Sequence, residues 1–154
     1  MTASSHHRVE ASRRIPAPPA RVYGVIADFE EGHPAILPPR HFRHFTVESG
    51  GRGAGTVMRF EMHLGGVSRR VRSVVAEPEP GRVLTETDSE HDTITTFVVD
   101  PIEQGEASMV TISTDLPSRR GLGGVIERRL ITMLLRGVYA KELTRLTRYA
   151  GERL

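Results

Sequence analysis

Apolar and polar residues alternate with a period of two through the middle of the chain and follow a helical period near both ends. The clearest alternation lies in residues 57–64. An alternation of this kind predicts a strand of an antiparallel sheet with one face in a core and the other in water. The inward residues are Met58, Phe60, Met62 and Leu64, and the outward ones are Arg59, Glu61 and His63.

Turn residues recur about every ten positions after His41, a spacing typical of a meander of antiparallel strands. The segments between the turns predict six consecutive strands: Phe42–Glu48, Thr56–Leu64, Val67–Ala76, Arg82–Thr87, Thr93–Val99 and Ser108–Leu116. A weaker alternation over Glu10–Ile15 predicts one strand earlier in the chain. Together they predict a sheet of about seven strands.

Helical spacing predicts one helix at Pro19–Asp28, where prolines supply the start, and a short second piece at Ala35–Leu37, ended by Pro38 and Pro39. The last segment, Leu122–Arg153, predicts a much longer helix, of roughly 45 Å at 1.5 Å per residue. Its apolar residues recur every three or four positions, and they are Leu122, Ile126, Leu130, Met133, Leu134, Val138, Leu143, Leu146 and Tyr149. We therefore expect this helix to cover the inward face of the sheet.

The length of 154 residues fits one domain, residues 1–154, with residues 1–7 as a disordered leader. No cysteine is present, which excludes disulfides and thiolate chemistry. The first 14 residues have no apolar run of signal-peptide length and no segment is apolar enough to cross a membrane, so a cytoplasmic location is the default expectation. We expect a monomer or a homodimer.

The net charge of +2 argues against a nucleic-acid partner, because acidic residues are spread among the arginines and no basic stripe alternates with aromatics. We expect no cofactor and no metal. The glycines from Gly51 to Gly55 lack the spacing of a dinucleotide-binding loop and precede a strand instead of a helix. His41 and His44, three apart on a strand, point to opposite faces and do not form a metal site.

Three segments are similar to one known superfamily: Ile15–Tyr23, at the start of the first helix; Gly51–Val57, a glycine loop before a strand; and Thr96–Pro101, a hairpin before the last strand. With the order of elements, they resemble the START/Bet v 1-like (SRPBCC) superfamily, in particular bacterial members described as polyketide cyclase/dehydrase or lipid-transport-like. The resemblance implies an α+β helix-grip fold. A curved seven-stranded antiparallel sheet wraps around the long C-terminal helix, and two short helices separate the first two strands.

Such a fold encloses a cavity, because a strongly bent sheet does not press flat on a straight helix. The expected apolar walls are Met58, Phe60, Met62 and Phe97 from the sheet, with Ile126, Leu130, Met133 and Leu134 from the helix. The alternative is that these side chains simply fill the core. The loop from Gly51 to Gly55 is expected to be a mobile hairpin loop and a flap over the mouth of the cavity.

Three polar residues are candidates to orient a ligand or move protons: Tyr23, His33 and Glu86. For His33, which precedes Pro34 in a corner between helices, the plainer interpretation is a surface residue of a turn. The acidic stretch from Glu86 to Asp92 is interpreted in the same way, as a solvated hairpin tip. The sequence indicates no catalytic residues beyond these candidates.

These observations predict a protein that binds or carries a small hydrophobic molecule, such as a lipid, polyketide or aromatic metabolite. The alternative is a polyketide cyclase/dehydratase-type enzyme that uses the same cavity, and a protein-interaction module ranks last. The polar content of the cavity discriminates between the first two. A dry wall favours the carrier, and a buried histidine or carboxylate with a partner favours the enzyme.

Overall fold

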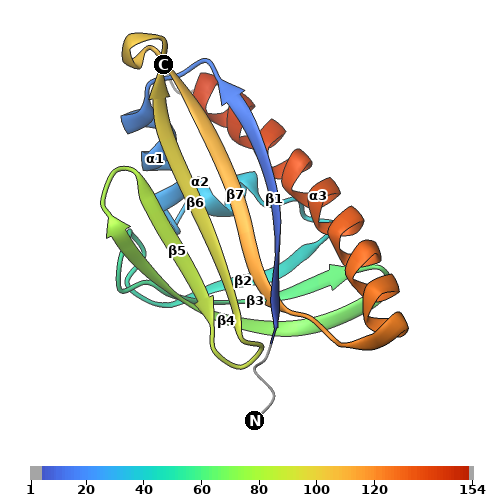
Figure 1. Cartoon of the computed structure of the whole chain (residues 1–154). Helices are drawn as coiled ribbons and strands as arrows, with labels where there is room; N and C mark the ends of the chain where they lie inside the picture. Colours follow the sequence, from blue (N-terminus) through green and yellow to red (C-terminus); the bar gives the residue numbers. More distant parts are fainter. Residues whose placement is uncertain (1–4, 153–154) are drawn as a thin grey trace.

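The computed structural model describes residues 5–152, with the backbone alone described for Glu152. Seven strands form one antiparallel sheet in the order β1-β7-β6-β5-β4-β3-β2 (Figure 1). The strands are β1 (His6–Ile15), β2 (Phe42–Ser49), β3 (Val57–Leu64), β4 (Val67–Glu79), β5 (Val83–Asp88), β6 (Thr93–Ile102) and β7 (Ala107–Pro117). The helices are α1 (Pro19–Ala27), α2 (Gly32–Ile36), the 3-10 turn η1 (Glu103–Gly105) and α3 (Gly121–Glu152).

This arrangement confirms the expected helix-grip fold. The sheet bends so that β2, β3 and β4 cross beneath β5, β6 and β7, and α3 runs diagonally along its inner side (Figure 1). The helices α1 and α2 contact α3 near its end and close that side of the molecule. The expected end of α3 at Arg153 lies outside the described residues.

The first strand begins earlier than expected. β1 pairs with β7 along its whole length, from His6 opposite Pro117 to Ile15 opposite Ser108. Alternate side chains of β1, including His7 and Val9, are buried on the inner face of the sheet. The expectation of a disordered leader is therefore wrong for His6 and His7, because both pair with β7 and His7 is also buried. Residues 1–4 lie outside the described part.

The glycine loop before β3 is anchored to α1. The amide of Phe29 donates to the carbonyl of Gly51, and the amide of Gly53 donates to the carbonyl of Ala27. Gly53 has a φ of 58°, and a Cβ there would lie 2.5 Å from the carboxylate of Glu77. The loop is held against the end of α1 and is absent from the cavity lining within the described residues, so it does not lie over the cavity as the expected flap.

The two halves of α3 differ in what they contact. In the second half, Val138, Leu143, Leu146 and Ala150 are buried and, with Leu135 at the middle of the helix, complete the core with α1 and the inner face of the sheet. In the first half, large apolar side chains are exposed: Leu122, Val125, Ile126, Leu130 and Met133. The apolar repeat of the sequence thus continues along a helix whose first half leaves a large part of its apolar surface exposed. Among the described helices none has the length and hydropathy required to cross a bilayer.

Candidate functional site

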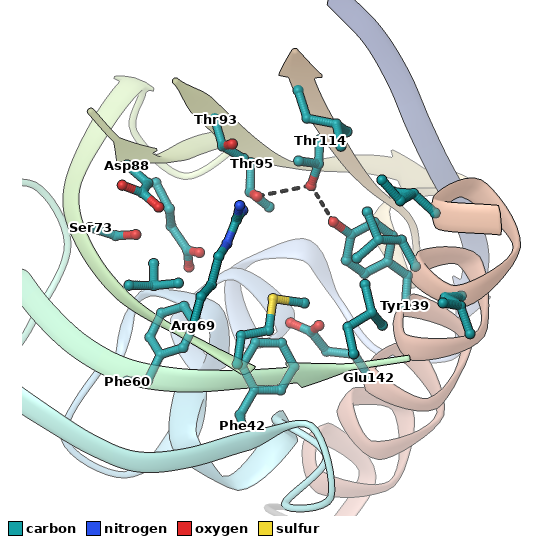
Figure 2. A pocket seen from close by; sticks show the side chains of 18 of the residues that line it. Phe42, Phe60, Arg69, Ser73, Asp88, Thr93, Thr95, Thr114, Tyr139 and Glu142 are labelled. Atoms are coloured by element: carbon teal, nitrogen blue, oxygen red, sulfur yellow. Dashed lines mark hydrogen bonds between the residues drawn. The ribbon is translucent and has the colours of Figure 1, made fainter. Parts of the chain in front are cut away.

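A cavity of about 410 Å³ lies between the sheet and α3, within the size range of small-molecule sites. Much of its wall is apolar, and polar side chains from both the sheet and α3 also point into it (Figure 2). The apolar lining comprises Leu37, Phe42, Phe60, Met62, Leu64, Val67, Val71, Phe97, Leu116, Leu130, Ile131, Leu134 and Leu135. The polar lining comprises Arg69, Ser73, Glu86, Asp88, Thr93, Thr95, Thr114, Glu127, Tyr139 and Glu142.

Six of the expected site residues line this cavity: Phe60, Met62, Glu86, Phe97, Leu130 and Leu134. The expected inward face of β3 is confirmed, since Met58 is also buried, although in the core beyond the cavity wall. Ile126 and Met133 were expected as walls, but they are 63% and 64% exposed on the outer side of α3. Their helical angles differ from that of Leu134 by about a quarter of a turn, which is enough to turn them outward.

Tyr23 lies outside the cavity. Its hydroxyl donates a hydrogen bond of 2.7 Å to Oε1 of Glu77, on β4 near the glycine loop. Burial, followed by this hydrogen bond and the charge of Glu77, raises the pKa of Tyr23 above its ordinary value. Tyr23 therefore stabilises the contact between α1 and β4, and it does not face the cavity as expected.

His33 is buried instead of standing in a solvated turn. Its ring stacks on Phe29 with centroids 4.4 Å apart and meets the edge of Phe97 at 5.5 Å. Gly32 makes this placement possible, because a Cβ there would lie 2.7 Å from the carbonyl oxygen of Val25 in α1. The close approach of α2 to α1 carries the imidazole into the core, behind the cavity wall.

The two ring nitrogens of His33 define its charge. Nδ1 lies 2.7 Å from the carbonyl oxygen of Ile26, which only accepts, so Nδ1 carries a proton. Nε2 lies 3.1 Å from Oε1 of Glu86, within ion-pair distance although not aligned for a linear hydrogen bond. Burial alone would lower the pKa of His33, but the charge of Glu86, with smaller contributions from Glu142 and the Ile26 carbonyl, raises it. We infer an imidazolium that holds the Glu86 carboxylate at the cavity wall.

Glu142, on the packed half of α3, is a second buried carboxyl group in the wall. Burial raises the pKa of Glu142 to about 8, opposed by the charge of His33 and assisted by that of Glu86. Within residues 5–152 its carboxyl has no hydrogen-bonding partner. At neutral pH this group is therefore mainly protonated, and its proton is available to a ligand.

Three hydroxyl groups of the cavity wall form a hydrogen-bonded chain next to Glu142 (Figure 2). The hydroxyl oxygens of Thr95 and Thr114, on neighbouring strands, are 2.9 Å apart and share a hydrogen bond. The Thr114 hydroxyl is also hydrogen-bonded to the hydroxyl of Tyr139 on α3 (Figure 2). Burial raises the pKa of Tyr139, so the phenol stays neutral. The chain fixes α3 against β7 and presents hydroxyl groups to the cavity.

Two further charged side chains line the cavity, Asp88 and Arg69. The carboxylate of Asp88 contacts Nδ1 of His91 at 2.6 Å, so this part of the acidic stretch is buried and paired, contrary to the expected solvated tip. The side chain of Arg69 extends into the pocket (Figure 2). No described acidic residue lies within ion-pair distance of it. The guanidinium of Arg69 is therefore available to bind an anionic or carbonyl group of a ligand.

Sequence reasoning missed Glu142, Tyr139, Thr114, Thr95 and Arg69. One signal was present for the first two, because they occupy helical positions between Val138 and Leu146 that belong to the buried stripe. A carboxylate in such a stripe is a poor core residue and is therefore a candidate for function. The strand hydroxyls gave no such signal. No group of described residues has the composition and proximity of a metal site.

The fold and its cavity place the protein in the START/Bet v 1-like class, which agrees with the resemblance seen in the sequence. KanY protein, solved by NMR, has a TM-score of 0.83 at 25% identity, covering 96% of this chain and 99% of its own. The Zhui aromatase/cyclase of a Streptomyces species has a TM-score of 0.74 at 17% identity, and the match covers 97% of this chain and 96% of that one. A START superfamily protein of Mycobacterium smegmatis has a TM-score of 0.71 at 15% identity, and the match covers 96% of this chain and 99% of that one.

The chain belongs to the family described as polyketide cyclase / dehydrase and lipid transport, whose pattern matches residues 6–151. The two structures below 25% identity support the fold alone. Among curated proteins no sequence matches this chain.

Proposed function

We propose that this protein binds a small apolar molecule bearing carbonyl groups and moves protons within it, as a cyclase or dehydratase does. The observation that carries the proposal is the pair of carboxyl groups in the cavity wall, Glu86, mostly buried and held by His33, and Glu142, buried without a hydrogen-bonding partner among the described residues. A wall built only to hold an apolar cargo has no need of buried ionisable groups, which cost free energy to desolvate. The sequence pattern favoured carriage over catalysis, and these two carboxyl groups favour catalysis over carriage.

The two carboxyl groups suit opposite roles. Glu86, paired with an imidazolium, is the base that removes a proton from a carbon next to a carbonyl group. Glu142, mainly protonated at neutral pH, is the acid that donates to the carbonyl oxygen as the enol forms. His33 does not line the cavity and is a positioning residue. Such a step is common to aldol-type cyclisation and to dehydration.

The apolar remainder of the wall supplies binding. A ligand that buries about 300 Å² of apolar surface gains roughly 7 kcal/mol before the costs of ordering. Carriage without chemistry is the second candidate, and the apolar lining of the cavity is the observation that favours it. The two candidates share the binding step and differ only in proton transfer.

Deuterium exchange separates the two candidates without knowledge of the natural substrate. An aryl 1,3-diketone is incubated in D₂O with the protein, and loss of the proton signal at the central carbon is followed by NMR. We expect exchange faster than in buffer, and a loss of at least tenfold of that enhancement in Glu86→Gln and in Glu142→Gln. Glu90→Gln, at an exposed turn position, is the matched control.

Binding is measured on the same samples by the change in ligand line width. Wild-type protein that binds the diketone without accelerating its exchange contradicts the enzymatic proposal and supports carriage. A protein that binds neither this diketone nor fatty acids in a thermal-shift panel, and does not accelerate exchange in the diketone, contradicts both the enzymatic proposal and carriage.

A further inference from the structure

The first half of α3 carries an apolar strip that nothing in the described chain covers. Leu122, Ile126, Leu130 and Met133 lie within about a quarter of the helix circumference at 100° per residue, and each is at least half exposed. Val67, at the turn between β3 and β4, is 68% exposed. Large apolar side chains gathered on one surface mark an interaction site.

The strip is bordered by positive charge. Residues 118–141 contain six basic residues and one acidic residue, Glu127, which pairs with Arg119. A shallow groove beside the strip is lined by Val125, Thr132 and Met133 together with four arginines, Arg8, Arg128, Arg129 and Arg136. Arg8 is bonded to Asp115, whereas no described acidic residue pairs with Arg128 or Arg129. The partner of this surface must therefore be anionic.

The strip also reaches the cavity. Leu130 and Val67 are largely exposed and at the same time belong to the cavity lining, so they mark the place where the cavity opens to the surface. An apolar path therefore leads from the cavity to the strip. In Figure 1 the start of α3 lies beside the tips of β3 and β4, which agrees with this position.

Charge decides between the occupants. A second copy of the chain placed on the same face would bring two arginine groups together, which opposes association. An anionic lipid surface satisfies both parts of the face, since apolar side chains of an amphipathic helix enter the boundary of the acyl chains while arginines reach the phosphates. We propose that residues 122–136 of α3 dock on an anionic lipid surface and that the cavity exchanges its ligand there. The docking is independent of any chemistry in the cavity.

Vesicle flotation with the full chain tests the docking. Vesicles of phosphatidylcholine with 30% phosphatidylglycerol, on the order of the anionic content of a charged leaflet, are compared with vesicles of phosphatidylcholine alone. We expect at least tenfold stronger binding to the anionic vesicles and a marked loss when the salt concentration rises from about 50 to about 500 mM.

Two variants separate the apolar and the charged parts. Ile126→Glu and the double variant Arg128→Ser with Arg129→Ser should each weaken binding at least fivefold, with melting temperatures near that of the wild type because these side chains are exposed. Ile94→Glu, at an exposed position on β6, is the control and should bind as the wild type does.

Three results would overturn the proposal. The first is no binding of the wild-type chain to anionic vesicles, whatever else the face binds. The second is binding that both variants retain, which would place the contact on another face. The third is a dimer in solution that Ile126→Glu dissociates, which would make a second copy the occupant.

Discussion

Glu142 is a carboxyl group at a position where helix packing asks for an apolar residue. It lies between Val138 and Leu146, both buried, and the only nearby positive charge is the imidazolium of His33 among the residues described. Burial therefore favours its neutral form. Because its pKa is raised, this residue makes the folded state bind a proton more tightly than the unfolded chain does.

The stability of the protein should consequently fall as the pH rises. The folded pKa of Glu142, about 8, lies above its value of 4.5 in an unfolded chain. The stabilisation is complete below the unfolded value and is lost as the pH rises through the folded one. A difference of about 3.5 pKa units corresponds to about 5 kcal/mol at most, or roughly 10–20 °C in melting temperature for a domain of this size.

Melting temperatures between pH 5 and pH 9 test this expectation. Glu142→Gln should flatten the decrease, and its advantage over the wild type should be largest at pH 9. His33, whose folded pKa is also raised, acts in the same direction and remains in the variant, so some slope persists. Equal slopes for the variant and the wild type would show that Glu142 ionises as it does in water.

At the scale of elements, α3 is one continuous helix whose halves contribute very differently to stability. Leu146 is fully buried, whereas Leu122 is 80% exposed. Leu146→Ala should lower the free energy of unfolding by about 2–5 kcal/mol, and Leu122→Ala should change it by less than about 0.5 kcal/mol. Denaturant titration of the two variants measures both values, and similar losses would contradict the division.

The elements themselves were largely predictable, since period-two segments and turn residues indicated every strand of the sheet. The inner face of β3 followed from the same alternation. The halves of α3 were not predictable, because leucine and methionine recur at helical spacing along both and spacing carries no information about what covers a face. The burial of His33 likewise depends on the packing of α2 against α1, which is a tertiary contact.

For the whole molecule, the cavity draws its lining from β2 to β7 and from α3, so ligand binding should stabilise all of the fold together. A neutral apolar dye at about 100 times its dissociation constant should add roughly 2.7 kcal/mol. In a domain of this size the melting temperature should then rise by about 5–10 °C. Differential scanning fluorimetry at intrinsic wavelengths or calorimetry measures the rise.

Phe60→Asp places a charge on the inward face of β3 and should abolish that rise. Val74→Asp, at an exposed position on the neighbouring strand, should keep it. A Phe60→Asp variant that folds and still shows the full rise would mean that the dye binds elsewhere.

The division of α3 has a consequence for how such a protein diversifies. Substitutions near Glu142 alter the chemistry inside the cavity, and substitutions between Leu122 and Met133 alter what the outside of the helix touches. Because the first half contributes little to the core, selection can change it without loss of the fold. Homologous proteins with the same interior should therefore differ most at the exposed positions of this half, such as Leu122, Ile126 and Met133. Exchanging only these positions between them should move the site of action while leaving the reaction as it was.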